Sequence, residues 1–425
     1  MSAASDSAGG SGTSGTGAGS GATSTGGTSL DEIPKIISVD DHVIEPANVW
    51  TDRLPSKYSE VWPRTLQERG HTNFVGGAFS YEPADDGDLC DWWLYEDKKI
   101  PQTRLSAAAG FARDEVKVVG ITYEEMRKGC WDPVARLEDM DANWTEAQMC
   151  FPSFPRFCGQ TFKEASDMVL ADLCVKAYND WMVEEWCGWS NGRLIPLIII
   201  QLWDAELAAA EIRRNAARGV RAVCFSEIPP YLDLPSIHTE YWEPFFRACS
   251  ETGTVINMHI GSSSRMPSTS TDAPAAVGST LTFGNAMSSM TDWLFSGWLP
   301  RFPDLKIAYS EGQIGWIPYI LERADKVWED NRAWGGFGDK VPDPPSTYYY
   351  RQMWGCYFDD EYGLDNLGKV GVNNICFETD YPHSDSTWPH SKEMAHKLMG
   401  HLPPDVVHKL MRGNAIDLLG LDFEP

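Results

Sequence analysis

The chain has 425 residues, of which 42% are hydrophobic, and carries a formal net charge of −26. This length can bury a large core and fits one barrel domain with insertions. The negative charge argues against nucleic acid or an anionic membrane as a partner, because such a surface repels phosphate groups. The longest apolar run, 194–200, is far shorter than the roughly 18 residues of a membrane span, so we expect no membrane segment.

Composition also bears on domain organisation and compartment. Residues 1–30 are a low-complexity mixture of Gly, Ser, Ala and Thr. Such a segment cannot bury enough apolar surface to fold, so we predict a disordered tail before one domain over 31–425. The tail lacks the basic and apolar regions of a signal peptide. The 10 cysteines are scattered singly, which predicts reduced core thiols and a cytoplasmic protein.

The first predicted strand, 35–39, is followed by a long segment without regular periodicity. Residues 51–130 are rich in aromatic side chains, among them Trp92 and Trp93, and are too long for a simple loop. We predict an inserted lid or a small antiparallel subdomain beside the active-site mouth, with Trp92 and Trp93 contacting substrate. A packing or subunit-contact element explains the aromatic residues equally well.

After residue 130, strand and helix patterns alternate to the C-terminus. The predicted strands are 147–151, 193–200, 220–225, 254–258, 305–310, 353–358 and 375–377, and the predicted helices are 133–144, 171–186, 206–217, 241–252, 281–299, 314–331, 364–371, 391–399 and 404–419. About eight strand–helix units in one domain favour an α/β fold, a (β/α)8 barrel, over an open sheet. The absence of a GxGxxG after the first strand and of a P-loop motif argues against a nucleotide site.

Polar residues lie where several predicted strands end. Asp40 and His42 end the first strand, His259 ends the fifth, and Asp380 follows the eighth. Because strand ends converge at one face of a barrel, these residues predict a metal site. Carboxylate and imidazole ligands together suit Zn, Mn or Fe. A single histidine such as His259 is more often a packing residue, but the shared position of the set favours ligation.

Further residues are candidates for proton transfer or substrate binding. Glu311 ends the sixth strand and could be a general acid/base, a bridging ligand to a second metal, or a carboxylate that orients a ligand histidine. Glu45 and His383 lie on loops beside the predicted ligands, and each could be a ligand, a proton shuttle or an orienting group. Arg265, in the polar loop 262–280, could bind a substrate carboxylate, although arginine is usually a surface residue.

Several motifs resemble those of the amidohydrolase-related proteins, the amidohydrolase 2 family. They are Val39-Asp40-Asp41-His42-Val43-Ile44-Glu45-Pro46, the segment 136–153, Asn257-Met258-His259-Ile260-Gly261, Thr379-Asp380-Tyr381-Pro382-His383 and Arg412-Gly413-Asn414-Ala415. The resemblance covers about 35–422 and implies a distorted TIM barrel with a metal at its mouth. It implies Asp40, His42, His259 and Asp380 as ligands. The best-known members are non-oxidative decarboxylases, for example of carboxymuconate semialdehyde and dihydroxybenzoate, beside C–C or ester hydrolases.

Two positions depart from the family pattern. The first motif is D-x-H rather than H-x-H, and Glu311 stands where the decarboxylases have a catalytic histidine. A more oxygen-rich site favours Mn or Fe over Zn. We expect one metal per chain, although Glu311 leaves room for a second.

Three functions are compatible with these features. The first is a metal-dependent hydrolase or lyase, including a decarboxylase, acting on a small carboxylate or carbonyl substrate, with Glu311 or His383 moving the proton. The second is a dinuclear iron or manganese-iron monooxygenase, a type found in a minor branch similar to this family. The third is a non-catalytic barrel subunit of a paralogous complex. We expect a homodimer or a hetero-oligomer with a paralogue.

Overall fold

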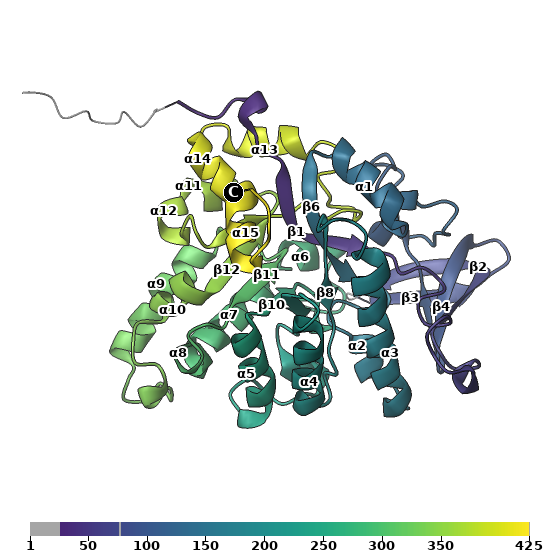
Figure 1. Cartoon of the computed structure of the whole chain (residues 1–425), viewed down its shortest axis with the longest axis horizontal. Coiled ribbons are helices and arrows are strands. Elements are labelled where there is room, and N and C mark those ends of the chain that lie inside the picture. The colour runs from purple at the N-terminus through teal and green to yellow at the C-terminus, as the bar shows by residue number, and fades with distance from the viewer. Residues whose placement is uncertain (1–25, 76–77, 425) are drawn as a thin grey trace, which may run out of the picture.

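The computed structural model describes residues 26–75 and 78–424, in which helices surround a core of parallel strands (Figure 1). The strands are β1 Ile36–Val43, β2 Arg64–Val75, β3 Ala78–Pro83, β4 Asp88–Tyr95, β5 Lys98–Pro101, β6 Thr145–Pro152, β7 Leu194–Ile195, β8 Leu197–Ile198, β9 Ala222–Cys224, β10 Val255–His259, β11 Ile307–Ser310, β12 Met353–Tyr357 and β13 Ile375–Phe377. The helices are α1 Pro133–Ala142, α2 Gln160–Lys163, α3 Met168–Trp181, α4 Ala205–Ala216, α5 Glu243–Thr252, α6 Ala275–Thr280, α7 Gly284–Ser296, α8 Trp298–Arg301, α9 Ile317–Asp330, α10 Pro345–Gln352, α11 Glu361–Asp365, α12 Leu367–Val370, α13 Ser391–Met399, α14 Pro404–His408 and α15 Asn414–Leu419.

The parallel strands form two sheets with the orders β1-β6-β7 and β13-β12-β11-β10-β9-β8. The predicted strand 193–200 is divided into β7 and β8 at Pro196, because proline has no N–H to donate to a ladder. At the other edges, the segment that follows β13 bonds to β1. The backbone N–H of His42 donates to the carbonyl of Tyr381 at 2.6 Å, and that of Asp380 donates to the carbonyl of Asp40 at 3.0 Å. The predicted alternation of strands and helices is confirmed.

Local sequence signals explain where several helices begin. Asp132, Asp167 and Asp204 stand directly before α1, α3 and α4, and each side chain accepts a hydrogen bond from a backbone N–H of the first helical turn. These caps satisfy donors that a helix cannot satisfy internally. All residues of β1 and β10 are buried, as expected for parallel strands covered by helices.

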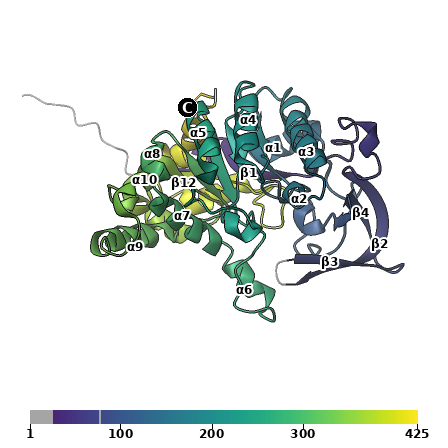
Figure 2. The ribbon, with the colours of Figure 1, turned by 90° about the horizontal axis from the view of Figure 1, so that it is seen from below.

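The insertion between β1 and β6 contains a four-stranded antiparallel sheet with the order β3-β2-β4-β5. Figure 2 shows this sheet on one flank of the molecule, beside α2 and α3. Trp93 of β4 connects it to the main body, because its ring stacks on Phe154 at a centroid distance of 4.6 Å and meets the edge of Trp50 at 5.2 Å. An antiparallel subdomain is therefore what the aromatic segment forms.

Several predicted boundaries differ from the structure. Most of the predicted tail, 1–25, lies outside the described residues. Thr28, inside that predicted tail, is ordered: its N–H donates to the carbonyl of Gly400 and its hydroxyl to that of Leu402. The predicted helix 281–299 is broken at Gly297, whose φ of 84° ends α7. Across residues 26–75 and 78–424, no helix combines the length and apolarity needed to cross a bilayer.

Candidate metal centre

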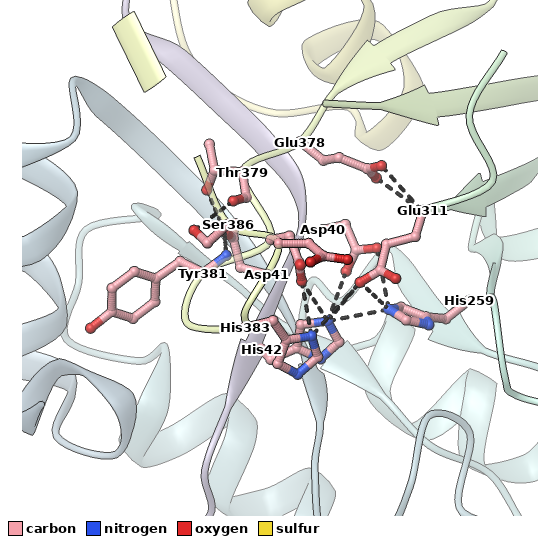
Figure 3. A network of polar contacts seen from close by, with 12 residues as sticks. Asp40, Asp41, His42, His259, Glu311, Glu378, Thr379, Tyr381, His383 and Ser386 are labelled. Atoms are coloured by element: carbon pink, nitrogen blue, oxygen red, sulfur yellow. Dashed lines mark hydrogen bonds and ion pairs between the residues drawn. The ribbon is translucent and has the colours of Figure 1, made fainter. Parts of the chain in front are cut away.

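The ends of the parallel strands bring together all the residues predicted as ligands. β1 supplies Asp40 and His42, β10 ends at His259, and Glu311 directly follows β11. Asp380 lies three residues after the last residue of β13. In Figure 3, the imidazoles of His42 and His259 and the carboxylate of Glu311 point toward one another, with Asp40 beside them. The prediction that these residues share one site agrees with the structure.

The potential ligand atoms surround a space of the size of one coordination shell. From Nε2 of His42, the distances are 3.2 Å to Nε2 of His259, 3.3 Å to Asp380 Oδ1, 3.5 Å to Glu311 Oε1 and 3.6 Å to Asp40 Oδ1. Nε2 of His259 lies 3.1 Å from Glu311 Oε1. Ligands about 2.1 Å from a metal ion are separated by roughly 3.0–3.4 Å in octahedral or tetrahedral geometry. The observed separations are close to that range.

Unmet hydrogen bonding at Asp40 indicates what the cluster holds. The side chain is fully buried, and within the described part of the chain neither carboxylate oxygen has a hydrogen-bond partner. Burial raises the pKa of Asp40 well above its usual value, and the charges of Glu378 and Glu311 raise it further. A divalent cation would compensate both effects. Mixed carboxylate and imidazole donors fit Mn, Fe or Zn, so the residues present fit a divalent metal.

The cluster contains two overlapping sets of possible ligands. One set is Asp40, His42, His259 and Glu311; the other is His42, Glu311, Asp380 and His383. His383 Nδ1 lies 3.0 Å from Asp380 Oδ1 and 3.8 Å from Glu311 Oε1. Because the sets share His42 and Glu311, the same residues can hold one ion, or two ions with Glu311 between them.

Burial and charge act in opposite directions on His383 and Glu311. Burial lowers the pKa of His383, but the carboxylates of Asp380 and Glu311 outweigh it and raise the pKa to about 10. Burial raises the pKa of Glu311, but His259 and the other two imidazoles hold it well below its usual value. In the metal-free protein the two groups therefore form a charged pair.

An unusual backbone conformation directs two of the acidic side chains. Glu311 has a φ of 53° and Asp380 a φ of 52°, in the left-handed region that residues other than glycine seldom adopt. The N–H of Glu311 is held by Glu378, whose two carboxylate oxygens each accept from it at 3.2 Å. Such conformations concentrate at functional sites. Sequence reasoning did not identify Glu378, although it lies two residues before Asp380.

Asp41, between the two ligands of β1, fixes the loop that carries Asp380 and His383. Its carboxylate accepts from the N–H of Tyr381 at 2.9 Å and from the hydroxyl of Thr379. Alternation along the strand explains this role, since Asp41 points away from the face on which Asp40 and His42 lie. The D-D-H motif thus combines two predicted ligands with one residue that supports the opposite side of the centre.

Helix α1 supports the same two segments through Arg136 and Asp139. The fully buried guanidinium of Arg136 donates to the carbonyl of His42 at 2.6 Å and lies 4.4 Å from the ring centroid of Tyr381. The hydroxyl of Tyr381 donates to Asp139. Neither residue was predicted as part of the site. Both residues lie in the segment 136–153, and its resemblance to the family is the only feature of the sequence that marks them.

Glu45 is not a metal ligand in this structure. Its two carboxylate oxygens accept from the N–H groups of Ser153 and Phe154, at 2.9 and 2.8 Å, which joins the end of β1 to the end of β6. Burial raises the pKa of Glu45 to about 7. Arg265 is exposed, and its guanidinium lies 4.9 Å from the ring centroid of Tyr231. A substrate contact by Arg265 stays a prediction.

The expectation that Trp92 and Trp93 line the mouth is wrong, because both are packing residues. They are 0% and 2% exposed, and the indole N–H of Trp92 donates to the carbonyl of Glu68 inside the insertion. A different part of the insertion reaches the loop that carries His383. The N–H groups of Ala108 and Ala109 both donate to the carbonyl of Pro382, at 2.7 and 3.1 Å.

An α/β fold with buried carboxylates and imidazoles at the ends of parallel strands defines a metal-dependent enzyme. The family model described as Amidohydrolase matches residues 68–421. The chain therefore belongs to the amidohydrolase family, which confirms the resemblance inferred from its motifs.

Individual relatives have low sequence identity but high coverage. The 2-amino-3-carboxymuconate-6-semialdehyde decarboxylase of Dictyostelium discoideum is 23% identical over 325 residues, which are 72% of this chain and 82% of the relative. The structure of an amidohydrolase from Mycobacterium avium subsp. paratuberculosis aligns with a TM-score of 0.67 and 20% identity, covering 92% of this chain and 98% of the other. A 5-carboxyvanillate decarboxylase from Novosphingobium aromaticivorans, in complex with manganese and 4-hydroxy-3-methoxy-5-nitrobenzoic acid, aligns with a TM-score of 0.62, 14% identity and coverages of 94% and 99%. The two structures show that the fold is shared.

Proposed function

We propose that the protein is a metal-dependent lyase that removes a carboxyl group from a small aromatic or conjugated carboxylic acid. The observation that carries this proposal is the buried cluster of carboxylates and imidazoles, in which Asp40, His42, His259 and Glu311 form one possible ligand set and His42, Glu311, Asp380 and His383 form the other. Two of the relatives described above are decarboxylases by name, one of them in complex with manganese. The oxygen-rich ligand set is consistent with the same metal here.

The exposure of the cluster indicates which of its members face the substrate. Asp40 and His42 are completely buried, whereas the side chains of Glu311 and His383 are 13% and 18% exposed. We infer that the buried residues hold the metal, which would polarise an oxygen of the bound substrate. Loss of CO₂ leaves the bonding electron pair on the substrate carbon, which must then take up a proton. We infer that His383 donates that proton and that Glu311 orients the imidazole, while solvent at the exposed side of His383 restores its proton.

The insertion and the parallel strands complete this proposal. We infer that the two parallel sheets function as one barrel, and that the segment around Ala108 and Ala109 covers the side of the mouth next to His383. The sheet β2–β5 would support this cover rather than contact the substrate. Cytoplasmic location and a dimeric or hetero-oligomeric state stay predictions from the sequence.

A second candidate is the dinuclear iron or manganese-iron monooxygenase. The observation that favours it is the pair of overlapping ligand sets with Glu311 in common, because a shared carboxylate can bridge two ions. This candidate requires about two metal ions per chain and the consumption of dioxygen.

Elemental analysis combined with a gas-exchange assay tests both candidates. The protein is purified without chelator, its metal content per chain is measured, and CO₂ release and O₂ uptake are followed with a panel of hydroxylated and amino-substituted aromatic acids. About one metal ion and CO₂ release without O₂ uptake support the decarboxylase. About two ions with O₂ uptake support the monooxygenase. A chain that binds no metal would contradict both and favour the non-catalytic subunit.

A further inference from the structure

A buried acidic residue, Glu227, lies near the metal centre but belongs to neither ligand set. It follows β9, which pairs in parallel with β10, the strand that ends at His259. β10 in turn pairs with β11, which precedes Glu311. The ends of three neighbouring strands therefore present Glu227, His259 and Glu311 at the same edge of the sheet.

The hydrogen bonding of Glu227 is incomplete. The residue is 2% exposed, and no described residue makes a hydrogen bond to either of its carboxyl oxygens. Its backbone is fixed, because its N–H donates to the hydroxyl of Ser262 at 2.9 Å. The hydroxyl of the preceding residue, Ser226, is also buried without a partner in the described chain. Two successive residues thus offer unused polar groups.

Glu45 is a useful contrast, because it is an equally buried glutamate at the end of another strand. Both oxygens of Glu45 accept backbone N–H groups, so its role in the fold is complete. The carboxyl oxygens of Glu227 make no such hydrogen bonds to described residues. Leaving a buried carboxyl group unpaired costs stability, so the unpaired carboxyl group of Glu227 requires an explanation, and binding of a ligand is one.

The carboxyl group of Glu227 interacts electrostatically with Glu311 of the metal centre. Burial raises its pKa well above the usual value, and the charge of Glu311 raises it further. The backbone amide of Gly261 acts in the opposite direction and lowers the pKa, but burial outweighs it. A carboxyl group in this environment can donate as well as accept a hydrogen bond.

We propose that Glu227 is a specificity-determining residue that forms a hydrogen bond with a hydroxyl or amino substituent of the substrate beside the metal centre. This inference rests on the proposed function and narrows the substrate to acids that carry such a substituent. It explains a buried polar group that neither metal binding nor the packing of the fold uses.

Ligand binding to the manganese-loaded protein tests this role without requiring turnover. The probes are benzoate and its 2-, 3- and 4-hydroxy derivatives, with dissociation constants measured by isothermal titration calorimetry. We expect at least one hydroxybenzoate to bind the wild-type protein about tenfold more tightly than benzoate, as one buried hydrogen bond allows. Glu227→Leu should abolish this preference while leaving benzoate affinity and manganese content unchanged. Glu227→Gln should retain part of the preference, because an amide still forms hydrogen bonds.

The matched control is Glu45→Gln, which alters a buried glutamate of structural role and should leave the ratio of affinities unchanged. If the wild-type protein binds all four acids without preference, or if Glu227→Leu changes their affinities equally or not at all, the role of Glu227 is refuted and the proposed function stands. If none of the four acids binds the manganese-loaded wild-type protein, the proposal of an aromatic acid substrate fails, and this inference with it. Should Glu227→Leu not fold, the comparison with Glu227→Gln decides.

Discussion

The metal centre and the antiparallel insertion are both rich in residues that suggested function, but their buried polar groups differ. In the insertion, the indole of Trp92 donates to Glu68 and Asp91 accepts the N–H of Tyr123, while the buried groups without a hydrogen-bond partner in the described chain include the hydroxyl of Tyr95 and the side-chain amide nitrogen of Gln102. In the centre, both oxygens of Asp40 are buried without a partner in the described chain. A carboxylate buried with both oxygens unpaired is therefore more informative about function than an unpaired neutral group, because an uncompensated buried charge costs more free energy.

The two regions are connected through the loop that carries Asp380 and His383. The backbone bonds from Ala108 and Ala109 to Pro382 join the insertion to the loop that carries Asp380 and His383. Trp93, by contrast, packs against Trp50 and Phe154. Substitutions in the two regions should therefore separate metal binding from stability.

The largest expected effect follows removal of a ligand. Asp380→Ala and His259→Ala should each weaken manganese binding by at least about 100-fold, more than is typical for residues outside the ligand shell. Residues at this face of the strands serve function more than stability, so the fold should persist. Metal analysis and circular dichroism measure the two effects. Full metal occupancy in both variants would show that the site lies elsewhere.

The next largest effect is expected at Glu311. Glu311→Gln keeps the shape of the side chain but removes the proton-carrying group, so the rate of CO₂ release should fall about 10²–10⁴-fold at unchanged metal content. A metal titration is run beside the assay. A fall from about two ions per chain to about one would identify Glu311 as a bridging ligand instead. If neither the rate nor the metal titration changes, Glu311 has no role in the active site.

A smaller effect on metal affinity is expected when a residue that positions the loop carrying Asp380 and His383 is substituted. Tyr381→Phe removes the hydrogen bond to Asp139 and should weaken manganese binding by about tenfold, because the loop carries Asp380 and His383. Tyr348→Phe is a matched control, since that hydroxyl is bonded to Asp343 in another part of the fold. Equal effects of the two variants on metal affinity would contradict a positioning role for Tyr381.

The smallest effect on metal affinity is expected from a substitution in the antiparallel insertion. Trp93→Leu removes a buried ring that joins the sheet to the main body and should lower the free energy of unfolding by about 3 kcal/mol. Manganese affinity should not change. Thermal or denaturant unfolding and a metal titration test this pair of expectations. Loss of bound metal without a change in the free energy of unfolding would indicate that Trp93 has a role in the active site.

The sequence predicted which residues would meet at the centre because their signal is local. Each lies where a buried apolar run gives way to polar residues, and in a parallel α/β fold such points converge. Asp40, His42, His259 and Asp380 could all be found in this way. The supporting residues could not, because their partners are remote: Tyr381 and Asp139 are 242 positions apart, and nothing near either residue indicates the other.

The sequence by itself determined the alternation of strands and helices and the family. Hydrophobic periodicity and short motifs record these directly. Only the tertiary structure decided which polar side chains have partners. Glu45 and Glu227 look alike in sequence, because each is a glutamate just beyond a strand. Both carboxylate oxygens of Glu45 accept hydrogen bonds from backbone N–H groups, whereas in the described chain those of Glu227 accept none. Hydrogen bonding between distant segments depends on how the chain folds back on itself, and that information is not contained in any local stretch of sequence.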